Sequence, residues 1–120
     1  MKPYQDARVE GEKLAKQYAE LEKADQVDFY NGLEGYYSVL GHNKKQEAIA
    51  VLIKKNDHKI YVYQLDKGIS QDKAATISRE KGASDIDKIT FGRYQDKPIW
   101  EVKSGKQYYL VDFETGAVIQ

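Results

Sequence analysis

The chain of 120 residues contains no cysteine, only two histidines and no long apolar run. The lack of cysteine excludes disulfides, zinc thiolates and thiol nucleophiles together. No segment approaches the roughly 18 consecutive apolar residues that a membrane-spanning helix needs. Acidic and basic residues number 19 each and are interspersed, so the chain lacks the charge excess that attracts nucleic acid or an anionic membrane. We therefore expect no nucleic-acid partner.

Residues suited to catalysis or cofactor binding are also few. His42 and His58 stand beside turn-forming residues and not at metal-ligand spacing. The nine glycines occur singly and form neither a Walker loop nor a dinucleotide fingerprint. No serine stands in a Gly-x-Ser-x-Gly elbow. We predict no catalytic residue, no metal site and no cofactor.

Three carboxylates near the C-terminus invite comparison with a glycosidase pair. A sheet can hold Glu101, Asp112 and Glu114 at useful separations. Asp112, however, directly precedes a turn, where its carboxylate accepts backbone N–H bonds, and Glu101 is expected on a strand facing water. The structural interpretation is favoured over the catalytic one.

The distribution of apolar residues predicts alternating helices and strands. From Tyr4 to about Ala24 apolar and small residues recur at helical spacing, which predicts an amphipathic helix. Ser70 is placed to cap a second helix that Gly82 ends. Residues 48–54 are almost wholly apolar and are expected to form a central strand buried on both faces. The expected strands span residues 27–30, 36–40, 48–54, 60–65, 86–91, 99–103, 107–113 and 117–119.

The last fourteen residues read as two strands joined by a tight turn. Asp112 precedes the turn Glu114-Thr115-Gly116, where only a glycine readily adopts positive φ. The stretch resembles the closing hairpin of the PepSY domain, Tyr-x-Val-Asp-x-x-Thr-Gly-x-Val. The matching positions are Tyr109, Val111, Asp112, Thr115, Gly116 and Val118, with a similar helix start at 68–75 and a similar middle strand at 98–102.

The first half extends the resemblance to the TseB-like (YpmB-like) family of cell-wall elongation regulators. Residues 35–39 followed by 47–53 look like the degenerate first PepSY unit of that family. The resemblance implies an α+β fold of two PepSY (cystatin-like) units, 1–66 and 67–120. Each unit would pack a helix on a small antiparallel sheet, and together they would form one rigid body.

The same resemblance implies a function that is not catalysis. It predicts an extracytoplasmic domain, held at the cell membrane by an N-terminal segment absent from this chain, that binds an elongation-type penicillin-binding protein, a class B transpeptidase. An alternative is a peptidase inhibitor or propeptide-like module acting in trans, because PepSY domains also occur in protease propeptides. A third is a lectin-like module that binds peptidoglycan through aromatic residues.

Ten tyrosines and one tryptophan are unusual in so short a chain. Neighbouring strand residues point to opposite faces, so some of these rings are expected to face outward, where aromatic residues are enriched in interfaces. We predict Tyr61, Tyr63 and Tyr108 as partner-binding residues. Trp100 is predicted as a core anchor, and Asp112, Thr115 and Gly116 as a structural turn.

Overall fold

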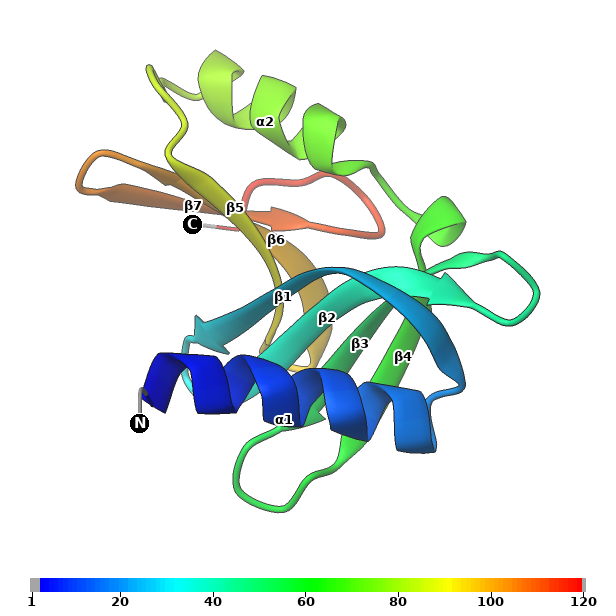
Figure 1. Cartoon of the computed structure of the whole chain (residues 1–120). Helices are drawn as coiled ribbons and strands as arrows, with labels where there is room; N and C mark the ends of the chain where they lie inside the picture. The colour runs from blue at the N-terminus through cyan, green and yellow to red at the C-terminus, as the bar shows by residue number, and fades with distance from the viewer. Residues whose placement is uncertain (1–2, 120) are drawn as a thin grey trace. The chain divides into compact units, whose positions relative to one another are not determined.

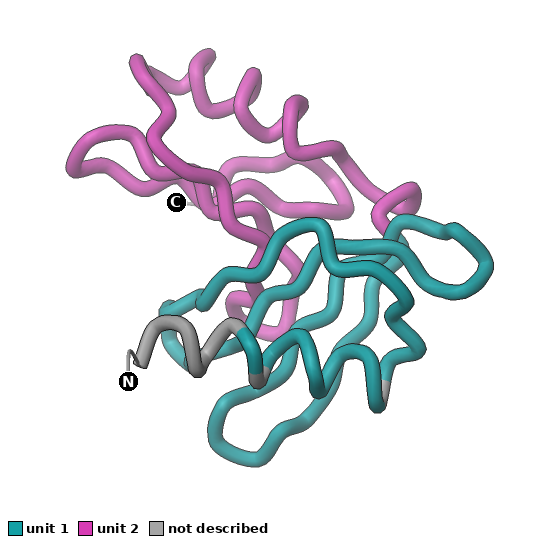
Figure 2. The backbone as a smooth tube through the Cα atoms, viewed as in Figure 1, with its two compact units in different colours: residues 1–64 teal, residues 65–120 magenta. Residues whose placement is uncertain are grey.

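The computed structural model describes residues 3–119, and for residues 3–8, 10 and 18 it describes the backbone alone. The fold is α+β, with two antiparallel sheets and two α-helices (Figure 1). The chain divides into two compact units, residues 1–64 and 65–120 (Figure 2). The predicted boundary after residue 66 falls within the short 3-10 helix η1 (Leu65–Lys67). That the two units form one rigid body stays a prediction.

The first unit is a four-stranded sheet with α1 (Pro3–Tyr18) packed against it (Figure 1). All strand pairs are antiparallel and neighbours along the chain, in the order β1-β2-β3-β4. Every residue of β3 from Ile49 to Ile53 is buried, which confirms the predicted central strand. The strands are β1 (Leu21–Asn31), β2 (Gly35–Asn43), β3 (Ala48–Lys54) and β4 (Ile60–Gln64).

The first predicted helix is too long, because α1 ends at Tyr18 and not near Ala24. Glu20 adopts a φ of 57°, which breaks the helix, and Leu21 then starts β1 and is only 3% exposed. Burial of Leu21 in the cluster beneath α1 therefore outweighs the helix propensity of the residues that follow.

The second unit is a three-stranded sheet, in the order β5-β6-β7, with α2 packed against β6 and β7 (Figure 1). The Ser70 hydroxyl accepts the N–H of Lys73 at 3.0 Å, which confirms the predicted cap of α2. The elements are α2 (Gln71–Glu80), β5 (Lys88–Tyr94), β6 (Lys97–Ser104) and β7 (Gln107–Asp112).

Two strand predictions in this unit need correction. β5 begins at Lys88, two residues later than predicted. It also ends later, because Gln95 and Asp96 both have positive φ and form a tight two-residue turn that keeps Tyr94 in the strand. The expected strand 117–119 is reduced to one isolated bridge, between Val111 and Val118. No helix among the described residues is long and apolar enough to cross a membrane.

Candidate protein-binding surface

The strand β4, which carries the predicted residues Tyr61 and Tyr63, forms one edge of the first sheet (Figure 1). Tyr61 lies opposite Leu52 and Tyr63 opposite Ala50 on β3. Both rings are half-buried, whereas Val62 between them is 49% exposed. The aliphatic side chain, and not the tyrosines, is therefore the more accessible part of this strand.

Tyr61 is held on the sheet by neighbours on two sides. Its ring meets that of Tyr36 edge to face, with centroids 6.3 Å apart. The ammonium of Lys59 lies 5.6 Å from the Tyr61 ring centroid, within the range of a cation–π contact. The start of β4 therefore carries an aromatic ring, Tyr61, with the exposed positive charge of Lys59 beside it.

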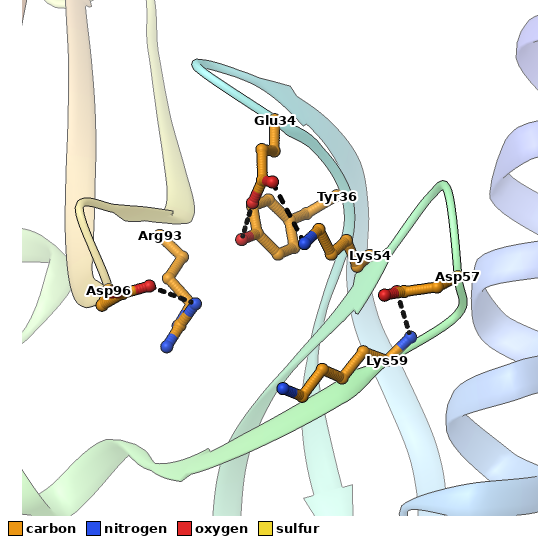
Figure 3. A network of polar contacts seen from close by, with 7 residues as sticks. All are labelled: Glu34, Tyr36, Lys54, Asp57, Lys59, Arg93 and Asp96. Carbon is orange, nitrogen blue, oxygen red and sulfur yellow. Dashed lines mark hydrogen bonds and ion pairs between the residues drawn. The ribbon is translucent and has the colours of Figure 1, made fainter.

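The turn before β4 is ordered by its own polar groups. The Asp57 carboxylate accepts the backbone N–H of Lys59 at 3.0 Å (Figure 3), and His58 adopts a φ of 58°. The His58 N–H donates to the Lys54 carbonyl at 2.8 Å. These bonds close the loop between β3 and β4 and fix where β4 starts.

A polar network that the sequence did not single out lies at the same end of the sheet, formed by Tyr36 of β2, Lys54 of β3 and Glu34 in the turn before β2. Lys54 Nζ lies 3.0 Å from a Glu34 carboxylate oxygen, and the Tyr36 hydroxyl donates to the other oxygen at 3.1 Å (Figure 3). The hydrogen bond from Lys54 is the main cause that lowers the pKa of Glu34. The same bond raises the pKa of Lys54, so both groups are charged at neutral pH.

The other end of β4 carries the opposite charge. The Gln64 amide donates to one Glu47 oxygen at 3.3 Å, and the Asn43 amide donates to the other at 2.9 Å. Glu47 is exposed. The edge strand thus runs from the exposed Lys59 to the Glu47 carboxylate, with uncharged residues between.

In the second unit, Trp100 lies at the centre of an aromatic core. Its ring contacts Phe91 and Phe113 edge to face, with centroids 4.9 and 6.4 Å away. The indole N–H donates to the Ile69 carbonyl at 3.0 Å, which ties the sheet to the segment before α2. Trp100 is only 2% exposed, so the structure places it in the core.

The turn after β7 is built by the three residues expected there. One Asp112 oxygen accepts the N–H groups of Glu114 and Thr115 at 2.8 and 3.1 Å. The Thr115 hydroxyl accepts the N–H of Ala117 at 3.1 Å, and Gly116 adopts a φ of 81°. The Asp112 carboxylate and the Thr115 hydroxyl thus accept hydrogen bonds from the backbone of the turn, which is a structural role.

The three carboxylates considered for catalysis do not share one environment. Burial raises the pKa of Glu101, although the charge of Lys88 opposes the shift. Asp112 is buried within its turn, and Glu114 is exposed. Among the described residues, no group of three histidine, aspartate or glutamate side chains is arranged to hold a metal ion.

Tyr108, the third predicted binding residue, belongs to a different unit from Tyr61 and Tyr63. It belongs to β7 of the second unit, opposite Lys103, and is 53% exposed. Also in this unit, Arg93 contacts Asp96 at 3.3 Å across the β5–β6 turn (Figure 3). Partner binding by Tyr61, Tyr63 and Tyr108 stays a prediction.

Sequence reasoning missed the exposed Val62 and the charges that flank it. Alternation assigned Val62 to the side of β4 away from the tyrosines, but only the pairing order shows that β4 is an edge. The network of Glu34 and Lys54 joins residues far apart in sequence, and no local motif marks it.

Comparison with known proteins gives consistent matches. A family model described as the cell wall elongation regulator TseB-like domain matches residues 10–54. The probable cell wall elongation regulator TseB of Bacillus subtilis strain 168 is 37% identical over 114 aligned residues, covering 88% of this chain and 70% of that protein. The solved structure of the YpmB protein from Bacillus subtilis matches with a TM-score of 0.78 and 32% identity, covering 100% of this chain and 96% of that one.

Proposed function

The chain belongs to the family of TseB-like cell wall elongation regulators, and on that premise we propose that it is a non-catalytic module that docks onto an elongation-type penicillin-binding protein. The observation that carries the proposal is the 37% identity to a protein named as a cell wall elongation regulator. A regulator of this kind acts by contact, while the transpeptidase it binds performs the bond-forming chemistry.

The first unit offers a surface suited to such contact. β4 presents the exposed Val62 on one face of the sheet and the half-buried Tyr61 and Tyr63 on the other, and aromatic and aliphatic residues of this kind are the usual anchors of protein interfaces. The exposed Lys59 beside Tyr61 adds a positive charge that can orient a partner as it approaches.

The proposal includes an envelope location, outside the cytoplasm and anchored by a membrane segment that precedes these residues in the native protein. It also takes both units to be of the PepSY type. Each unit packs one α-helix on an antiparallel sheet, and the second carries the Asp112 to Gly116 turn that resembles that family's.

Affinity purification of the tagged full-length protein from native membranes, followed by mass spectrometry, tests this function. The account predicts enrichment of a class B transpeptidase relative to membranes that express only the tagged anchor segment. Enrichment of a secreted peptidase without any transpeptidase would contradict it and favour the peptidase-inhibitor alternative.

A further inference from the structure

The two edges of the first sheet differ in how open they are to another strand. β1 has register shifts between Leu21 and Lys23 and between Ala24 and Gln26, and it carries several charged residues. Bulges and charges of this kind protect an edge from pairing. β4 pairs with β3 in regular register and contains no charged residue, so it lacks those protections.

The backbone of β4 has groups directed away from its neighbour. Lys54 N–H donates to the Lys59 carbonyl and the Lys54 carbonyl accepts the His58 N–H, both at 2.8 Å, so both backbone groups of Lys54 point toward β4. This direction alternates along a strand, so Leu52 and Ala50 also face β4, and their partners Tyr61 and Tyr63 bond to β3. The described residues include no strand on the other side of β4. The residues whose N–H and C=O groups point to that side are Ile60, Val62 and Gln64.

We propose that β4 is completed by an extended segment of the partner protein, which pairs with it along Ile60 to Gln64 as a fifth strand of the sheet. This inference rests on the proposed function and adds the binding mode. Main-chain hydrogen bonds supply the affinity in strand addition, and pockets for alternate side chains supply the specificity.

The residues around β4 define the chemistry of that segment. Next to Val62 it carries an apolar, β-branched or aromatic residue, which covers the exposed valine. At the start of β4 it carries an acidic residue, which meets the exposed Lys59. At the other end of β4 the segment carries a basic residue, because the exposed Glu47 lies there beside Gln64.

A partner segment fits this edge better than a second copy of the chain. Two β4 strands of five residues each bury far less than the roughly 1,000 Å² that a stable interface needs. A segment of a larger partner continues past Ile60 onto the Lys59 turn and gains contact area there.

The test compares two substitutions of Val62 in the full-length protein in native membranes, with a photo-crosslinking amino acid at the exposed Asn56. Val62→Pro removes an N–H that points away from β3 and leaves the β3–β4 ladder bonds in place. Val62→Ala removes most of the side chain but keeps that N–H, and serves as the matched control. Strand addition predicts that Val62→Pro lowers the crosslink yield about tenfold, whereas Val62→Ala lowers it about threefold or less.

The identity of the crosslinked product separates this inference from the proposed function. A transpeptidase product lost only in Val62→Pro supports both. A different envelope protein, identified by mass spectrometry and lost only in Val62→Pro, supports the edge pairing and overturns the transpeptidase partner. Equal yields in both variants, or a product that joins two copies of this chain, overturn the edge pairing.

Amide exchange of the chain that keeps Val62 and carries only the photo-crosslinking amino acid at position 56 keeps the test valid if Val62→Pro does not fold. In the crosslinked complex, strand addition predicts slower exchange at Ile60, Val62 and Gln64 than in the free chain. Tyr61 and Tyr63, which already bond to β3, are expected to change little. Unchanged exchange at the three outward amides would overturn the proposal.

Discussion

Two buried serines of the second unit differ in whether their hydroxyl makes a hydrogen bond, and this decides whether the hydroxyl raises or lowers the stability of the fold. The Ser78 hydroxyl is fully buried and has no hydrogen-bond partner. The Ser104 hydroxyl donates to the Asp85 carbonyl at 2.7 Å. An unpaired buried polar group lowers stability, whereas a paired one adds to it.

We expect Ser78→Ala to leave the free energy of unfolding unchanged or raise it by up to about 1 kcal/mol, because it removes an unsatisfied group. Ser104→Ala is expected to lower that free energy by about 1 kcal/mol, because the Asp85 carbonyl loses its donor. Urea unfolding of the two variants measures the difference. Equal losses from both substitutions would contradict this account of Ser78.

Glu101 gives a pH dependence of defined sign. Burial raises its pKa in the folded state above the ordinary value of 4.5, so folding favours the protonated carboxyl. The contribution of the protonated Glu101 carboxyl to the free energy of unfolding is fully present below pH 4.5 and is lost as pH rises through the raised pKa. Glu101→Gln should therefore raise the melting temperature at pH 7 and have little effect at about pH 3.5.

Thermal melting at the two pH values, with Glu114→Gln as an exposed control, measures this effect. The control is expected to shift the melting temperature less than Glu101→Gln at pH 7. A Glu101→Gln variant that melts lower than the unsubstituted chain at pH 7 would show that the charged carboxylate stabilises the fold instead.

At the scale of elements, the bulged start of β1 depends on a close approach to Gly41 on β2. Gly41 lies opposite Ala24, between the two register shifts. A Cβ at this position would collide with the Lys23 carbonyl oxygen. Only glycine allows the two backbones to come this close.

Gly41→Ala is therefore expected to lower the free energy of unfolding by about 2 kcal/mol or more, since β1 must move off β2. Glu22→Ala, at an exposed position of the same strand, is expected to change it by less than about 0.5 kcal/mol. Chemical denaturation of both variants measures these changes. A Gly41→Ala variant as stable as the unsubstituted chain would show that β1 adapts without cost.

The elements that the sequence predicted well are those set by local signals. β3 has the predicted bounds because its continuous apolar run suits only a central strand. α2 has a serine cap at its start and a glycine just beyond its end. The start of β1 was wrong because Leu21 to Ala24 reads as helix, and burial of Leu21 depends on distant residues of β2 and β3.

The binding surface was only partly predictable for the same reason. Periodicity located β4 and the alternation of Tyr61 and Tyr63. Which strand forms an edge depends on the pairing order of the whole sheet, and this order is a long-range property. The importance of Val62 and of the charges at the two ends of β4 follows from that order alone.

At the scale of the whole molecule, the C-terminal motif and the first-half strands were enough to identify the family. The likeness to TseB and YpmB of Bacillus subtilis supports that identification over most of the chain. The units differ at their hairpins, because the first closes with an Asp57 turn and a positive φ at His58, whereas the second uses Asp112, Thr115 and Gly116. The four-stranded first unit and the three-stranded second unit are thus closed by different turn chemistry.

The central claim is that this regulator binds a cell-wall transpeptidase through the edge strand β4. Photo-crosslinking from position 62 of the full-length protein in native membranes, compared with crosslinking from the exposed position 23 on β1, tests it most directly. The account predicts a transpeptidase captured from position 62 and at least about tenfold less from position 23. Capture of the transpeptidase from position 23 alone, or of no transpeptidase from either position, would contradict it.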